Sequence, residues 1–281
     1  MVQIWDAAQD VTLPWCLFGE ALNKSRHSKG RHGAGVLIGN GSERVSLHHS
    51  LLANLDFRNP LVKDAGAADI VENLVYNWGR TGGEVVDEIG REAHLNVVDN
   101  LYVAGPASRV PAFVVNKGET AHSVYPKIFA MDNRGPPAVA KGDRQFRMFS
   151  LGWDRPARSP ALHVSQAFAS PAVLRVGSAT LQATILAQVG VTRPLRDTLD
   201  GRIIEGVRSN SGKIIDSPTQ LGGYPHIAAA SAPLGSDHDG MPDAWEVRAG
   251  LDTSNAADAG VDRDGDGYTN IEEYLESLLA P

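Results

Sequence analysis

The chain has 281 residues, of which 42% are hydrophobic and 29 are glycines, a composition typical of a globular protein rich in turns. It has no apolar stretch long enough to span a membrane, and its single cysteine, Cys16, excludes a disulfide bond within the chain. The net charge of −7 is unevenly spread, because residues 236–281 hold twelve Asp or Glu and only two Arg, so the rest of the chain is slightly basic.

The first hundred residues contain four short strand-like segments of the same form, in which a small or amide residue precedes an apolar pair. These residues are Cys16, Ser50, Asn73 and Asn100, at intervals of 34, 23 and 27 residues. Such intervals are typical of a solenoid, in which each coil buries its apolar face by stacking on the next. Equivalent side chains then lie in register, and Asn can form a hydrogen-bonded ladder. A β-sandwich is the alternative, although its turns come more often than this.

A basic loop at residues 23–35 separates the first two strand segments. It contains three glycines, which allow the backbone to approach a ligand closely. Its six basic side chains belong to Lys24, Arg26, His27, Lys29, Arg31 and His32. A basic patch is compatible with nucleic acid, but the chain has no nucleic-acid-binding motif and a negative net charge, so we expect no such partner. A solvated loop is the alternative.

Residues 45–63 begin as a strand and then present two cations, Arg58 and Lys63. Because Pro60 biases the backbone before it away from the helical region, we expect Arg58 to lie on extended backbone. A guanidinium and an ammonium on one surface suit a polyanionic ligand. The alternative is a pair of solvated surface cations.

The middle of the chain, residues 106–160, is rich in Pro, Gly and charge, and we expect loops and irregular coils there with a strand at 124–131. Two amphipathic helices follow, because apolar residues recur every four positions in residues 181–189 and 199–207. Gly190 ends the first helix and Asp197 caps the second. We expect both helices to cover the solenoid.

The acidic tail contains a complete match to the EF-hand loop pattern D-x-D-x-D-G-x5-E. Its oxygen ligands would be Asp262, Asp264 and Asp266, the backbone carbonyl of Tyr268, Asn270 through water, and both oxygens of Glu273. Gly267 permits the sharp turn that this loop requires. The motif predicts a structural calcium ion that couples metal binding to folding.

A second, degenerate copy precedes it, with Gly235 at the position of the first ligand. The candidate ligands of this copy are Asp237, Asp239, Asp243 and Glu246. Both copies resemble the Asp-rich loops of dockerins and thrombospondin type 3 repeats, and a solvated acidic tail is the alternative. We therefore predict two domains, a body at 1–234 and a small α-helical calcium-binding module at 235–281.

Taken together, the segments of the body resemble polysaccharide lyase family 1, the pectate lyases. The resemblance covers most of residues 2–225 and rests on the order and spacing of several motifs. These are Trp15-Cys-Leu-Phe-Gly-Glu-Ala-Leu-Asn, His27-Ser-Lys-Gly-Arg-His-Gly, His48-His-Ser-Leu-Leu-Ala, Arg58-Asn-Pro, Glu72-Asn-Leu-Val-Tyr-Asn-Trp-Gly, Asp99-Asn-Leu-Tyr-Val-Ala-Gly-Pro and Gly212-Lys-Ile-Ile-Asp-Ser-Pro-Thr-Gln-Leu-Gly-Gly-Tyr-Pro. The resemblance implies an all-β solenoid, a right-handed parallel β-helix, and calcium-dependent eliminative cleavage of polygalacturonate.

By the same resemblance, Arg58 matches the family's catalytic arginine, either as the base or as a cation that stabilises the transition state. Lys63, Lys29 and His32 would contact the substrate. Family members bind their catalytic Ca²⁺ through acidic residues from earlier coils, and Gln3 stands where one such Asp is found. We therefore expect an N-terminally truncated chain without most of that calcium site.

The sequence thus predicts a secreted, monomeric polysaccharide lyase that acts on polygalacturonate, with Ca²⁺ as cofactor and without nucleic-acid or membrane partners. A non-catalytic β-helix fragment that binds acidic polysaccharide is the alternative. A hydrolase is disfavoured because no pair of carboxylic acids is recognisable near Arg58.

Overall fold

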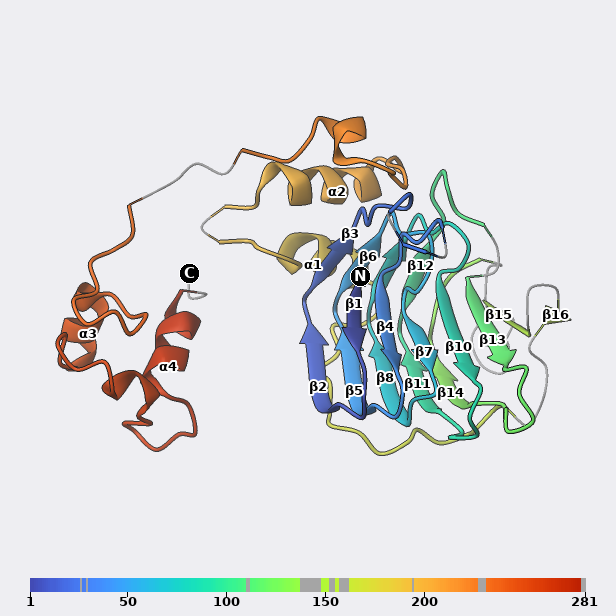
Figure 1. Cartoon of the computed structure of the whole chain (residues 1–281), viewed down its shortest axis with the longest axis horizontal. Helices are drawn as coiled ribbons and strands as arrows, with labels where there is room; N and C mark the ends of the chain where they lie inside the picture. The colour runs from blue at the N-terminus through green and yellow to red at the C-terminus, as the bar shows by residue number, and fades with distance from the viewer. Residues whose placement is uncertain are drawn as a thin grey trace. The chain divides into compact units, whose positions relative to one another are not determined.

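The computed structural model describes residues 1–25, 27–28, 30–109, 112–136, 148–151, 155–156, 162–193, 195–226 and 231–278 (Figure 1). The chain divides into two compact units. The first comprises Met1–Thr192 and Arg196–Pro225, and the second comprises Arg193–Leu195 and His226–Pro281. The boundary between residues 234 and 235 stays a prediction.

Three β-sheets make up the first unit (Figure 1). The first sheet contains, in order, β1 (Val2–Ile4), β4 (Val36–Gly39), β7 (Leu61–Lys63), β10 (Gly83–Asp87), β13 (Phe113–Lys117), β15 (Phe149–Leu151) and β16 (Arg155–Pro156). The second contains β2 (Gln9–Pro14), β5 (Glu43–His48), β8 (Ala67–Val71), β11 (His94–Val98) and β14 (Lys127–Met131). The third contains β3 (Leu17–Gly19), β6 (Leu51–Ala53), β9 (Leu74–Tyr76) and β12 (Leu101–Val103).

Successive coils of the chain stack in register. Each of the first four coils places one strand in each sheet, so the neighbour of a strand is the equivalent strand of the next coil. All of these pairings are parallel apart from the antiparallel pairing of β15 with β16. This arrangement fits a parallel β-helix and rules out the antiparallel β-sandwich that the sequence left open. The right-handed sense of the coil stays a prediction.

A sharp corner between the second and third sheets repeats in every coil. Its first residue has positive φ, between 49° and 54°, at Trp15, His49, Glu72, Asp99 and Asp132. The residue after it is the predicted small or amide residue. The backbone N–H of Ser50 donates to Asn73 Oδ1, that of Asn73 to Asn100 Oδ1, and that of Asn100 to Asn133 Oδ1, each at 3.0 Å. The predicted ladder is therefore confirmed, and it extends one coil further than predicted.

The apolar core lies between the sheets and arises from the two-residue alternation of the strands. In β5, Val45 and Leu47 are fully buried in the core, whereas Arg44, Ser46 and His48 lie on the outer face. Leu95, Phe113 and Phe149 continue the same core through later coils. Each such side chain contributes about 1.5–3 kcal/mol when fully buried.

Two helices cover the third sheet (Figure 1). α1 (Leu181–Gln188) and α2 (Thr198–Arg208) match the predicted helices, and the Asp197 side chain caps α2 by accepting from the N–H of Asp200 at 2.7 Å. Their apolar faces pack on the sheet in a cluster that includes Leu51, Leu74, Tyr76, Leu181, Ile185, Ile203 and Val207. The short 3-10 helix η2 (Pro218–Leu221) follows.

The middle of the chain is more regular than predicted. The strand expected at 124–131 begins only at Lys127, as β14, and β13 was predicted as a loop. β13 nevertheless pairs along its whole length with β10, because the preceding coil supplies a complete row of backbone partners.

The second unit is built from α3 (Asp243–Ala249), η3 (Asp258–Gly260) and α4 (Asn270–Ser277), with acidic loops between them. A capping box formed by Thr269 and Glu272 begins α4, and Gly250 ends α3 in the left-handed conformation. Among the described residues of the whole chain, no helix has the length and apolarity needed to cross a membrane.

Candidate functional site

Arg58 lies in the turn that joins β6 to β7. Its φ is +61°, so the expectation of extended backbone was wrong. The restriction imposed by Pro60 reaches only Asn59, the residue directly before it, and the peptide bond between these two is cis. The carbonyl of Arg58 accepts from the N–H of Val36 at 2.7 Å, which fixes the turn on the preceding coil.

The guanidinium of Arg58 lies beside an aromatic ring that it shares with a second arginine. Its Cζ is 5.0 Å from the centroid of the Phe57 ring, and the Cζ of Arg80 is 4.0 Å from the same centroid. Arg80 also forms an ion pair with Asp56, with Nε 2.9 Å from Oδ2. Burial lowers the pKa of Arg58, the charge of Glu84 opposes this effect, and the charge of Arg80 adds to it.

One carboxyl group, Glu84 of β10, lies among these cations. Burial raises its pKa, whereas a hydrogen bond from Asn116 and the charges of Arg58, Arg80 and Lys63 lower it. Lys63 ends β7 and forms an ion pair with Glu88, with Nζ 2.7 Å from Oε2. The charges of Arg58 and Lys63 therefore both lower the pKa of Glu84, and Lys63 is also paired with Glu88.

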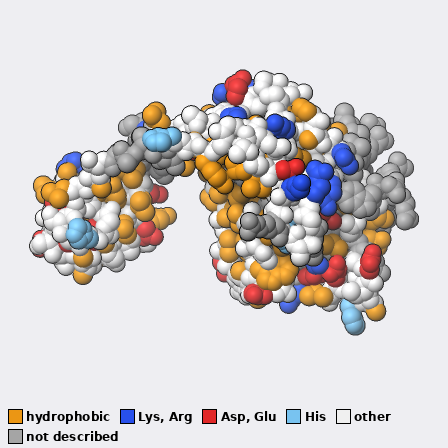
Figure 2. Space-filling view, turned by 45° about the horizontal axis from the view of Figure 1, so that its top comes forward, with side chains coloured by type: hydrophobic (Ala, Val, Ile, Leu, Met, Phe, Trp, Pro, Cys, Tyr) orange, Lys and Arg blue, Asp and Glu red, His pale blue; other side chains and the backbone are white. Residues whose placement is uncertain are grey.

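A hollow of about 780 Å³ opens beside Arg80. Among the described residues that line it are four cations and one acid, which are Arg31, Arg80, Arg109, Lys213 and Asp56. On the face drawn in Figure 2, Lys and Arg side chains gather in one patch of the first unit. We call this hollow, together with Phe57 and Arg58, the cationic site.

His32 and Lys29 are the two other residues predicted to contact the substrate, and the structure describes only the first of them. His32 stacks on His27 with ring centroids 4.0 Å apart and meets the Phe57 ring edge-on at 5.0 Å, so it borders the cationic site. Lys29 lies outside the described residues.

Sequence reasoning missed Arg80, Arg109 and Lys213. A signal for Arg80 was present, since the ladder interval of 23 residues, applied to Phe57, leads to residue 80 in the next coil. Lys213 comes from a distant segment that reaches the site because Ile215 accepts from the N–H of Asn23 at 2.7 Å. No local pattern indicates that contact.

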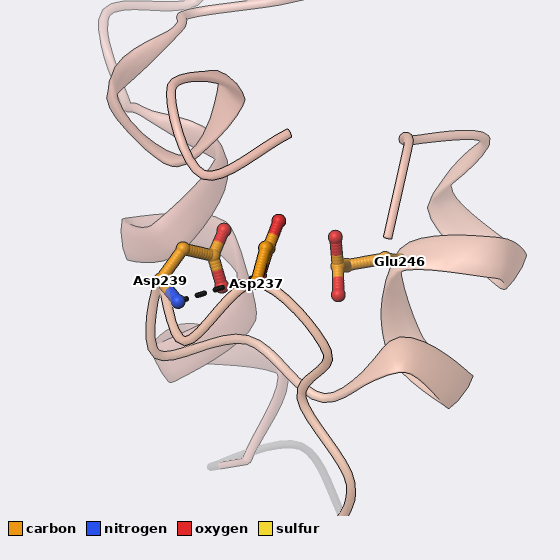
Figure 3. A group of neighbouring side chains, drawn as sticks. All are labelled: Asp237, Asp239 and Glu246. Atoms are coloured by element: carbon orange, nitrogen blue, oxygen red, sulfur yellow. Dashed lines mark hydrogen bonds between the residues drawn. The ribbon is translucent and has the colours of Figure 1, made fainter. Parts of the chain in front are cut away.

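A second candidate site lies in the C-terminal unit, where three carboxylates converge (Figure 3). Asp237 and Asp239 lie on a loop, and Glu246 points toward them from α3. Their ligand atoms all lie within 4.8 Å of one another. Burial and the charges of Asp237 and Asp239 raise the pKa of Glu246.

Several oxygens of this group are buried and have no hydrogen-bond partner. They are both carboxylate oxygens of Glu246 and one each of Asp237, Asp239 and Asp258. Asp258 begins η3, was not predicted as a ligand, and its charge also raises the pKa of Glu246. Unpartnered buried carboxylates are costly unless a cation accompanies them, so these residues fit a hard cation with oxygen ligands.

Asp243, by contrast, was predicted as a ligand but has protein partners. Its two oxygens accept from the N–H and the hydroxyl of Ser236, at 2.6 and 2.7 Å. It therefore organises the loop and stands outside the group of three carboxylates.

The complete EF-hand motif also brings carboxylates together. Asp262, Asp264 and Asp266 offer oxygens within 4.8 Å of one another, and all three residues are exposed. Asn270 is buried and its amide donates to the carbonyl of Asp258 at 2.7 Å. Glu273 lies in the first turn of α4 and is not part of the group. The role of Tyr268 stays a prediction. Within the described ranges, groups of three or more candidate ligands occur only in this unit.

The fold and the cationic site define a class of protein, a parallel β-helix with cations gathered on one side of its coils. No protein-family model matches the chain. The chain is 29% identical over 237 residues to a probable pectate lyase C of Aspergillus flavus, which covers 84% of the chain and 54% of the relative. It is 30% identical over 253 residues to a probable pectate lyase C of Aspergillus terreus, which covers 88% and 56% respectively.

A probable pectate lyase C of Emericella nidulans is 24% identical over 274 residues, 97% of the chain and 59% of the relative. These similarities support a relationship with the pectate lyases. The chain spans little more than half the length of these curated relatives.

Proposed function

We propose that the cationic site cleaves polygalacturonate by β-elimination, the reaction of a pectate lyase. The observation that carries this proposal is the half-buried guanidinium of Arg58, held against Phe57 beside Arg80 and the cation-lined hollow. A polyuronate has a carboxylate on every sugar, so a row of cations matches its charge. The similarity to proteins named probable pectate lyase C supports the same reaction.

The chemistry requires removal of the proton at C5 of a uronate and departure of the oxygen at C4. Negative charge develops on the carboxylate of that sugar as the proton leaves, and fixed cations stabilise it. Arg58 can supply this stabilisation as a cation. The role of base would require the guanidinium to lose a proton, and burial and the charge of Arg80 shift its pKa in that direction while Glu84 opposes the shift.

Arg80, Arg109, Arg31 and Lys213 would bind the carboxylates of neighbouring sugars. Asp56 holds Arg80 in place through their ion pair, and the Phe57 ring contacts the guanidinium groups of both Arg58 and Arg80. These residues would position the polygalacturonate so that the C5 proton of one sugar faces Arg58.

We further propose that Asp237, Asp239 and Glu246, joined by Asp258, hold a structural Ca²⁺, and that Asp262, Asp264 and Asp266 hold a second one. The unpartnered buried oxygens support the first site, and the fit of the loop to the EF-hand pattern supports the second. Bound calcium would supply positive charge that offsets the repulsion among these carboxylates. Extracellular calcium would keep such sites filled, so we expect a secreted protein, which we propose acts as a monomer.

The test uses the full chain and polygalacturonate, with ultraviolet absorbance of the unsaturated product as the readout. Arg58→Ala should lower the rate at least about 100-fold, the scale of losing one transition-state donor. The exposed Arg208, on α2, provides a matched control, and Arg208→Ala should leave the rate unchanged. The assay is repeated with added Ca²⁺ and with EGTA to determine whether elimination depends on calcium.

Pectate binding is measured in parallel. If the wild-type chain binds polygalacturonate but releases no unsaturated product with Ca²⁺ present, the non-catalytic alternative is correct. An unchanged rate in Arg58→Ala would remove this residue from the mechanism.

A further inference from the structure

A second groove lies on the outer face of the second sheet, on strands that the cationic site does not use. Its volume is about 260 Å³. The strands β2, β5 and β8 form its floor, and the segment 171–173 forms one wall. Its lining residues are Asp10, Thr12, Arg44, Ser46, His48, Asp69, Pro171, Ala172 and Val173.

A row of polar side chains crosses this face because the strands pair in register. Thr12, Ser46, Asp69 and Asn96 occupy equivalent positions in β2, β5, β8 and β11. The side-chain amide of Asn96 donates to Asp69 Oδ1 at 2.6 Å and to the carbonyl of Phe168 at 3.0 Å, and its oxygen accepts from the N–H of Phe168, so this end of the row is satisfied. Ser46 is only 9% exposed, and its hydroxyl is buried without a hydrogen-bond partner.

His48, two residues along the same strand face, is held in place from behind. Its Nδ1 lies 2.9 Å from Nδ1 of His49, and Nε2 of His49 lies 2.8 Å from Oε2 of the fully buried Glu72. Glu72 in turn accepts from the N–H groups of Val176 and Gly177. The imidazole that lines the groove is therefore fixed, with Nε2 as its remaining nitrogen. Burial and the neighbouring His49 lower the pKa of His48, which favours the neutral ring.

The charges around the groove differ from those of the cationic site. Arg44 is bound by both oxygens of Asp10, at 2.6 and 2.7 Å, so its charge is matched. Asp69 is the other acid that faces the groove, and among the described residues that line it no cation is unpaired. A carboxylate ligand would therefore meet no surplus positive charge.

We propose that this groove binds a neutral sugar unit. Each hydroxyl group of a sugar both donates and accepts hydrogen bonds. It therefore suits a groove that offers the hydroxyls of Ser46 and Thr12, the imidazole of His48 and the carboxylate of Asp69. Pro171, Ala172 and Val173 offer an apolar wall for the C–H face of the ring. The volume accommodates one sugar ring. The site is independent of the cationic site and of the reaction proposed for it.

The test is saturation-transfer NMR on the full chain with the methyl glycosides of galactose, glucose and arabinose, and with galacturonate as the charged comparator. At least one neutral glycoside should bind. Ser46→Ala removes the unpartnered hydroxyl without adding bulk, and it should weaken that binding by about fivefold or more. Lys213→Ala, in the cationic site, is the matched control and should leave it unchanged.

Three results would overturn the proposal. They are no transfer to any neutral glycoside, equal binding by the wild type and Ser46→Ala, or a loss in Lys213→Ala as large as that in Ser46→Ala. Because the outcomes concern neutral glycosides and no cleavage is measured, failure here leaves the proposed lyase activity untouched. Loss of lyase activity in Arg58→Ala likewise leaves this proposal untouched.

Discussion

The amide ladder of the coils and the carboxylate group of the C-terminal unit satisfy their buried polar groups in opposite ways. In the coils, the amide of Asn100 donates to the carbonyl of Ile70 and to Asn133 Oδ1, and its oxygen accepts from Asn73. In the C-terminal unit, both oxygens of Glu246 are buried without a protein partner. The amides of the ladder find all of these hydrogen-bond partners within the chain, whereas the carboxylate group requires a cation from solution.

The difference follows from the chemistry of the side chains. An amide both donates and accepts, so identical residues stacked in register satisfy one another. Ionised carboxylates only accept, so bringing them together creates repulsion that a cation must offset. The coils should therefore be insensitive to calcium, and the C-terminal unit should depend on it.

The largest expected effect comes from breaking the ladder. Asn100→Ala leaves the amide groups of two neighbouring coils unpaired, so the free energy of unfolding of the coils should fall by about 3–5 kcal/mol. Denaturant unfolding of the full chain measures this change. Cys16→Ala is the matched control and should have little effect, because Cys16 joins the ladder only through its backbone N–H. Equal losses in both variants would show that the ladder contributes no special stability.

Calcium removal should have the next largest effect, confined to the C-terminal unit. A ligand present at 100 times its dissociation constant stabilises the folded state by about 2.7 kcal/mol. Hydrogen exchange with Ca²⁺ and with EGTA should therefore show loss of protection in α3 and α4 and no change in β5 or β8. Unchanged protection in both units would contradict the calcium sites.

A substitution at one proposed calcium ligand tests whether Glu246 binds the ion. Glu246→Gln removes one charge from the group and should weaken calcium binding on the order of tenfold, since ligand charge tunes affinity. Isothermal titration calorimetry measures this affinity. Glu276→Gln, on an exposed position of α4, serves as the control. If both variants bind calcium like the wild type, Glu246 is not a ligand.

The smallest expected effect is a dependence of stability on pH in the coils. Burial lowers the pKa of His49, against the opposing effect of Glu72, and the pKa of His48 is lowered as well. The unfolded chain then binds protons at higher pH than the folded one. Stability is thus complete above the ordinary histidine pKa of about 6.5 and falls as the pH drops toward the lowered values.

Thermal unfolding midpoints between about pH 7 and about pH 5 measure this slope. His49→Gln should flatten it, and His122→Gln, at an exposed position, should leave it as in the wild type. A slope that persists unchanged in His49→Gln would assign it to other groups.

The features that the sequence predicted correctly are those that repeat from coil to coil or that depend on residues close together in the chain. The ladder, the cap at Asp197 and the convergence of Asp237, Asp239 and Glu246 all follow from short patterns, and the structure contains each of them. The backbone of Arg58 was predicted wrongly because a rule for the residue next to proline was extended one position too far.

Contacts between distant segments could not be predicted in the same way. Lys213 reaches the cationic site through a long-range backbone hydrogen bond, and Asp258 approaches Glu246 through the turn at η3. The groove at Ser46 forms only because the segment 171–173 crosses the sheet. In each case the site depends on a contact between segments far apart in the sequence, which no short sequence pattern predicts.

The central claim, that the cationic site cleaves by elimination, is tested most directly by the mass of the products. Oligogalacturonates are incubated with the full chain and the fragments are weighed by mass spectrometry. Elimination yields a new non-reducing end that is one water lighter than the product of hydrolysis, and we predict this lighter fragment, lost in Arg58→Ala and retained in Arg208→Ala. Fragments with the mass of hydrolysis products, or an intact substrate that stays bound, would contradict the claim.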